Sequence, residues 1–162
     1  MNFDSVDTWF FESLTQSYPD SLSIILAEGV KADTPELVEV DEETALGPYF
    51  PVRVENRSIC IEITFQEVFS YQVIDESYSA PQSEFESTVF LGPIKKCSKL
   101  YYLDYLEKDS ILSQTMEGEY SAYYIWTEDQ TFFVISGKDP EITIHDQKAN
   151  LSIERTATYF AK

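Results

Sequence analysis

Residues 59–73 read ICIEITFQEVFSYQV, and the fold prediction starts from this stretch. Apolar side chains occupy every second position of its first half, at Ile59, Ile61, Ile63 and Phe65. Alternation with a period of two is typical of a strand that buries one face. The same parity continues to residue 73 after an interruption at Glu67. The pattern therefore predicts one long strand, central in an antiparallel sheet, with a bulge or bend near Glu67.

The rest of the chain contains shorter strand patterns at the spacing of hairpins. They cover residues 21–30, 37–40, 87–91, 119–127, 131–136 and 141–144. Pro48 and Pro51 lie in an apolar segment, residues 46–51, which we expect to be a rigid loop because proline cannot donate a ladder hydrogen bond. Residues 150–162 form either a final strand or a frayed tail.

Two segments are expected to be helical. In residues 3–14 apolar side chains recur at helical spacing, after a capping Asp4 or Ser5. Ser98 can cap a second, short helix that runs to about residue 108. Strands outnumber helices and no βαβ alternation is present, so the sequence predicts an α+β fold. We expect a mainly antiparallel β-sheet covered by an N-terminal helix and a second short helix, in a single domain over residues 1–162.

The chain is strongly acidic and its charge is unevenly distributed. The formal net charge is −18, of which residues 1–94 carry −15 and residues 95–162 carry −3. Such an excess disfavours nucleic acids and anionic membranes as partners, because each requires Lys or Arg to neutralise phosphate. It favours rapid, salt-sensitive association with a basic protein. The alternative is that the charge serves solubility alone.

Two acidic clusters in the first 94 residues are candidates for contact with such a partner. Tyrosine beside carboxylates offers rigid contact area next to charges that can pair with Lys or Arg. The candidate partner-binding residues are Glu36, Glu39, Asp41, Glu42, Glu43, Asp75, Glu76, Tyr78, Glu84 and Glu86.

No motif for catalysis or for metal or cofactor binding is recognisable. One histidine and two cysteines 37 positions apart cannot supply a zinc site, and the five glycines are isolated, so no phosphate-binding loop is present. We interpret His145 as a turn residue, not a catalytic base. The run at residues 41–43 lacks the spacing of a calcium loop, although opportunistic cation binding there is an alternative. We expect a non-enzymatic protein without cofactor or metal.

The sequence also favours a cytoplasmic location. Residues 1–7, MNFDSVD, have neither the basic nor the apolar region of a signal peptide. No apolar run approaches the roughly 18 residues needed to span a bilayer. Cys60 and Cys97 fit a reducing compartment better than a disulfide framework.

Several segments carry a resemblance to known proteins. They are ITFQEVFSYQVIDESY at residues 63–78, SKL at 98–100, YYIWT at 123–127, VIS at 134–136 and DPEI at 139–142. Together they resemble a group of small, uncharacterised, acidic bacterial proteins that are associated with toxin-immunity loci. The resemblance spans roughly residues 59–142, about half of the chain. It implies a bacterial, cytosolic, non-enzymatic protein and assigns no functional residue.

Three functional hypotheses follow. The first is an immunity or inhibitor protein that neutralises a basic bacterial toxin domain, such as a nuclease with a basic cleft. The second is a small-molecule-binding domain or a carboxylate-based enzyme, with its cleft between sheet and helix. The third is a subunit of a larger assembly.

Overall fold

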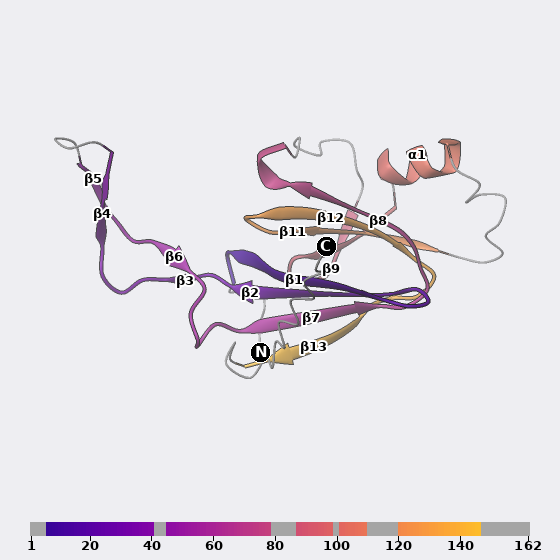
Figure 1. The fold of residues 1–162 in the computed structure, drawn as a ribbon, viewed down its shortest axis with the longest axis horizontal. Coiled ribbons are helices and arrows are strands. Elements are labelled where there is room, and N and C mark those ends of the chain that lie inside the picture. The colour runs from indigo at the N-terminus through magenta and orange to yellow at the C-terminus, as the bar shows by residue number, and fades with distance from the viewer. Residues whose placement is uncertain (1–5, 41–44, 79–86, 99–100, 110–119, 147–162) are drawn as a thin grey trace, which may run out of the picture.

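The computed structural model describes residues 6–40, 45–78, 87–98, 101–109 and 120–146. Within them the chain folds into two antiparallel sheets that pack face to face, with a hairpin extension that projects from one end (Figure 1). The first sheet has the order β1 (Trp9–Ser17), β2 (Ser21–Glu28), β7 (Cys60–Phe65) and β13 (Glu141–His145). The second has the order β8 (Val68–Asp75), β12 (Gln130–Ser136), β11 (Ser121–Trp126), β10 (Ile94–Cys97) and β9 (Ser87–Leu91).

The main core lies between the two sheets. Alternate residues of β7, namely Ile61, Ile63 and Phe65, are almost fully buried there, as the sequence predicted. Strand β7 is also central in its sheet, between β2 and β13. The second sheet contributes the facing side chains of Ile94, Tyr123, Ile125, Phe132 and Val134. Burying a large apolar side chain of this kind contributes about 1.5–3 kcal/mol, so this interface accounts for much of the stability.

A second, smaller core lies on the outer face of the second sheet, under helix α1 (Tyr101–Asp109). Tyr102 and Leu106 of the helix pack against Phe133 and Ile135 of β12. Strand β12 is therefore buried on both faces, since Phe132 and Val134 point into the main core. The second predicted helix is confirmed, and it covers this sheet.

The chain crosses from the first sheet to the second at Glu67. This residue has a φ of 56°, which ends β7 and redirects the chain into β8. Two hydrogen bonds hold this crossing. Ser136 Oγ donates to the carbonyl oxygen of Gln66 at 2.7 Å, and the backbone amide of Gly137 donates to the carbonyl oxygen of Glu67 at 3.0 Å. The predicted bend at Glu67 is confirmed. It divides residues 59–73 between two strands in different sheets, so the expected single long strand is wrong.

The predicted N-terminal helix is also wrong, because Trp9–Ser17 is strand β1. It pairs with β2, and its register shifts between Phe11 and Ser13. This bulge reverses the parity of the strand, so that Phe11 and Leu14 both pack against the main core although they are three residues apart. The helix was predicted from the spacing of Phe3, Val6, Phe10 and Leu14, and the four-residue spacing of Phe10 and Leu14 fits the alternation of a strand as well as a helix stripe.

The α+β class is therefore corrected to nearly all-β. The described residues form 13 strands, one α-helix and one turn of 3-10 helix, Glu76–Tyr78. The strands expected near residues 21–30, 37–40, 87–91 and 141–144, and the hairpin about residues 128–130, are confirmed. Residues 150–162, the expected final strand or tail, lie outside the described residues. Among the described residues, no helix has the length and apolar character that crossing a bilayer requires.

Candidate partner-binding surface

An extension between β2 and β7 holds the first acidic cluster. We call it the arm and define it as β3 (Val30–Lys31), β4 (Glu36–Glu39), β5 (Ala45–Tyr49) and β6 (Val52–Arg53) with the described residues between them. Strand β3 pairs with β6, and β4 pairs with β5; within the described chain neither pair joins the two sheets. Figure 1 shows the β4–β5 ribbon standing well away from the body of the protein.

The backbone of β5 explains how two prolines fit into the arm. Residues 46–51 were expected to be a loop, yet Ala45–Tyr49 is a strand. Val38 pairs with Leu46 and Glu36 pairs with Tyr49, so an extra residue is accommodated at Gly47 and Pro48. The missing N–H of Pro48 is tolerated within this bulge. Gly47 has a φ of 124°, a backbone conformation that residues with a Cβ atom rarely adopt.

The arm exposes large apolar side chains. The exposed fraction is 63% for Leu37, 51% for Val38 and 53% for Tyr49. The full set in the arm is Leu37, Val38, Val40, Leu46, Tyr49, Phe50 and Val52. Single exposed apolar residues are normal on protein surfaces, but a concentration of them marks an interaction site more often.

All three basic residues of the first 94 lie in or beside the base of the arm. Arg53 pairs with Glu36. Arg57 pairs with Glu55 at 2.7 Å, and the Lys31 ammonium lies 4.9 Å from the centre of the Phe50 ring. In the described part of the chain no ion pair includes Glu39, at the far end of β4. Glu36 and Glu55, near the base, are thus paired with arginines, in contrast to Glu39.

The second acidic cluster lies at the end of β8 and in the 3-10 turn. Asp75 and Glu76 are exposed, and 84% of the Tyr78 side chain is accessible. The backbone amide of Glu76 donates to the carbonyl oxygen of Asp129 at 3.1 Å, and Asp75 is in register with Gln130. The β11–β12 turn therefore lies alongside this cluster.

Glu128 and Asp129 of that turn were not among the predicted site residues. The structure adds them to Asp75 and Glu76, and we call these four residues the turn cluster. Their proximity depends on the pairing of β8 with β12, which no local pattern reveals. The Asp129 carboxylate also accepts a hydrogen bond from the amide of Phe11 at 2.9 Å, so it has a structural role at the edge of the first sheet.

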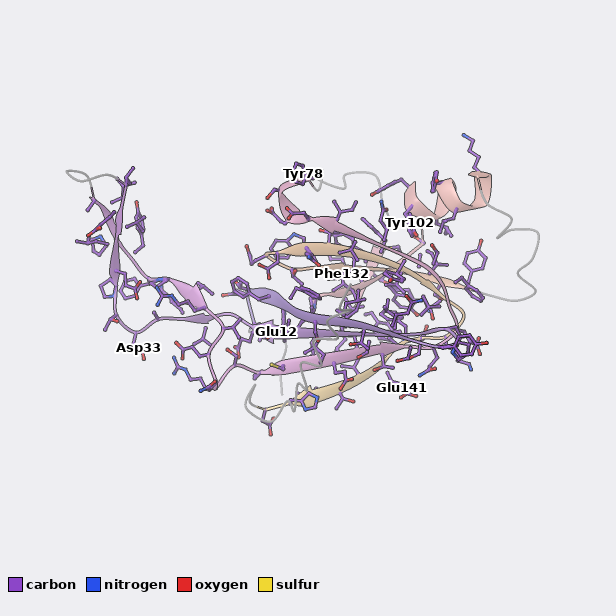
Figure 2. The ribbon with its side chains drawn as sticks, in the orientation of Figure 1. Glu12, Asp33, Tyr78, Tyr102, Phe132 and Glu141 are labelled. Carbon is purple, nitrogen blue, oxygen red and sulfur yellow. The ribbon has the colours of Figure 1, made fainter. Side chains whose placement is uncertain are left out.

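The predicted site residues do not form one surface. Glu36 and Glu39 lie in the arm, whereas Asp75, Glu76 and Tyr78 lie over the second sheet. Figure 2 labels Asp33 near the base of the arm and Tyr78 at the 3-10 turn, and the two are well separated. Asp41, Glu42, Glu43, Glu84 and Glu86 lie outside the described residues.

The histidine lies at the end of β13, in register with Cys60. Its Nε2 is 3.6 Å from Oε2 of Glu62. Cys60 has no exposed surface, so a substrate cannot reach its thiol in this conformation. Within the described ranges, no group of three or more His, Cys, Asp or Glu side chains is arranged to hold a metal ion.

A surface cavity of about 400 Å³ lies between α1 and the second sheet. Its described lining includes Thr88, Lys96, Cys97, Leu103 and Tyr120, with no carboxylate. Burial raises the pKa of the Cys97 thiol to about 11, so the thiol stays protonated at neutral pH and is a poor nucleophile. The cavity can accept a small molecule, but its described lining offers no carboxylate for the enzymatic form of the second functional hypothesis.

Asp139 connects the rim of this cavity to the main core. Its Oδ1 accepts hydrogen bonds from Lys96 Nζ at 2.7 Å and from the hydroxyl of Tyr123. The Lys96 ammonium lowers the pKa of Asp139, and the Tyr123 hydrogen bond adds to that effect. Burial, followed by the bond to Asp139, raises the pKa of Tyr123. This arrangement holds the connection between β12 and β13 against the second sheet.

No protein-family model, curated protein or solved structure matches this chain.

Proposed function

We propose that this protein is an acidic, non-enzymatic inhibitor that binds a basic protein, specifically an immunity protein that neutralises a basic bacterial toxin domain such as a nuclease. One observation supports the proposal above all others. The basic residues of the acidic half lie in or beside the base of the arm, whereas among the described residues Glu39 is in no ion pair and the apolar side chains of the ribbon are exposed.

The physical logic is competition for a basic cleft. A nuclease concentrates Lys and Arg where phosphate binds, and the resulting field attracts any acidic protein surface of suitable shape. Complementary charge raises the association rate and selects the partner, while buried apolar contacts slow dissociation. The arm combines both features on one projecting element.

Small-molecule binding is the second candidate, and the cavity beside Cys97 is the observation that favours it. Its volume lies within the range of ligand sites, about 300–1,000 Å³. A subunit of a larger assembly would also expose apolar residues on an arm.

The test is recovery of the tagged full-length chain from its native cells at low salt, followed by identification of what co-purifies. A stoichiometric basic protein whose enzymatic activity falls on addition of the pure chain is the expected result. Recovery of a large multi-subunit complex, or of a retained metabolite with no protein partner, contradicts the proposal and favours one of the other two functions.

A further inference from the structure

We propose that the β4–β5 ribbon of the arm is a docking element, which seats its apolar face in a groove of a basic partner protein. This inference rests on the proposed function in taking a basic protein as the partner. It adds which element binds, which face of that element is buried in the complex, and which residues carry the affinity.

The face is defined by the strand register. Residues directly opposite in an antiparallel pair share a face, so Val38 and Leu46 lie side by side. Tyr49, opposite Glu36, extends the same face toward the base of the arm. Leu37 and Glu39 project from the opposite face because side chains alternate along a strand. The first face is therefore apolar with one acidic residue, Glu36, which Arg53 neutralises.

The ribbon has little within the described chain to hold it in place. An isolated two-stranded hairpin is marginally stable in water, and every residue of β4 and β5 is exposed. Both outer edges of the ribbon lack a strand partner among the described residues. Exposed edges beside apolar side chains are what a partner protein covers when a hairpin docks.

The charge of the ribbon indicates which class of partner it binds. Residues 36–50 contain five acids and no base, and Glu36 pairs with Arg53, so two such ribbons that met would bring the eight other acids together. The same charge opposes approach to phosphate, which excludes nucleic acids and anionic membranes. A groove that is apolar inside and rimmed by Lys or Arg suits both the apolar face and the acidic composition of residues 36–50.

The direct test is site-specific photo-crosslinking of the full-length chain in its native cells, with benzoylphenylalanine in place of Val38. The same probe in place of Tyr18, a 98% exposed residue of the β1–β2 turn, is the control. We expect an adduct with one basic protein from position 38 and none with that protein from position 18. No adduct at position 38, equal adducts from both positions, or an adduct with a second copy of the chain or an acidic protein overturns the inference.

The affinity of variants for the purified partner then shows whether the docking face itself binds, or whether any exposed apolar side chain would serve. Val38→Ser combined with Leu46→Ser should weaken binding at least about tenfold, as truncation of central anchors does. Tyr18→Ser combined with Tyr105→Ser, which removes two exposed tyrosines elsewhere, should change it less than about twofold. Equal losses from the two pairs contradict the inference.

An armless variant distinguishes this inference from the proposed function. The amide of Ala32 donates to the carbonyl oxygen of Pro51 at 2.8 Å, so a short glycine-containing turn can replace residues 33–50. If the armless protein still inhibits a toxin with unchanged affinity, the function holds and the docking role of the arm is wrong. If the arm cross-links to a basic protein whose activity the chain does not inhibit, the docking role holds and the inhibitor function is wrong.

Discussion

Asp139 illustrates how a single exposed carboxylate can serve the fold. It pairs with Lys96 at 2.7 Å and accepts a hydrogen bond from Tyr123, whose ring lies in the main core. Solvent screens the pair, since 57% of the Asp139 side chain is accessible. Its contribution is therefore that of a surface ion pair, about 0.2–1 kcal/mol.

Asp139→Asn should reduce the free energy of unfolding by about that amount at neutral pH, and the deficit should vanish in acid. The pKa of Asp139 in the folded protein lies below its ordinary value of 3.8. The stability that the carboxylate contributes is therefore fully present above the ordinary pKa and is lost as the pH falls through the folded pKa. Urea unfolding at about pH 7, pH 5 and pH 3 measures the difference. Asp7→Asn, at an exposed site outside the ion pairs of the described residues, is the control. A deficit that persists unchanged at the lowest pH contradicts this account.

At the scale of elements, β7 and the β4–β5 ribbon contrast strongly. Strand β7 lies between two neighbours and buries one complete face in the main core. The ribbon has no buried residue. Stability should therefore be concentrated in the two sheets, and the arm should open without unfolding the body.

Ile63→Ala should lower the free energy of unfolding by about 2–4 kcal/mol, through lost transfer energy and the cavity left behind. Ile63 has no exposed surface and lies in register with Ile24 and Ile142. The matched control is Ile144→Ala on the edge strand β13, where 40% of the residue is exposed and the loss should be smaller. A loss below roughly 0.5 kcal/mol for Ile63→Ala would mean that this face of β7 is misplaced.

Gly47→Ala should distort the arm and spare the sheets. A side chain at this φ is strained, and its Cβ would lie 3.0 Å from the amide nitrogen of Tyr49 and 3.1 Å from the carbonyl oxygen of Glu36. Hydrogen exchange should accelerate in β4 and β5, with the midpoint of global unfolding nearly unchanged. Ala45→Ser in the same strand is the control. Global destabilisation comparable to that of Ile63→Ala would show that the arm and the body unfold together.

At the scale of the whole molecule, the candidate acidic residues lie apart from the elements that form the hydrophobic cores. The two sheets and α1 supply the cores, whereas the acidic candidates that the structure describes lie on the arm and in the turn cluster. The described candidate residues lie in two separate places, Glu36 and Glu39 in the arm and Asp75, Glu76 and Tyr78 at the end of β8 and in the 3-10 turn. A partner that contacts the arm need not contact the turn cluster, so the two can be tested separately.

Neutralising Glu39, Asp41 and Glu42 together should slow association with a basic partner and flatten its salt dependence, because peripheral charges act mainly on the association rate. The matched control neutralises three exposed acids away from the arm, Asp104, Glu141 and Asp146. Stopped-flow association between about 50 and 500 mM salt measures both effects, since the Debye length shrinks about threefold over that range. Equal slowing in the two variants would indicate net charge without a localised site, and a rate that ignores salt would refute the electrostatic account.

The sequence alone determined the features that local patterns encode. Period-two alternation identified most strands, the 98–108 segment identified the helix, and counting charges located the acidic half. These properties depend on neighbours in the chain, so they can be predicted without the fold.

Only the tertiary structure decided the features that depend on distant partners. The bulge in β1 places Phe11 and Leu14 on one face, and it follows from the pairing with β2, which the helical reading of residues 3–14 missed. The turn at Glu67 separates β7 from β8 because the register with β12 and β13 assigns them to different sheets. The same long-range pairing brings Asp129 beside Glu76 and leaves the β4–β5 ribbon without a further strand partner among the described residues. Contacts between remote segments are set by packing of the whole core, so they leave no local signal in the sequence.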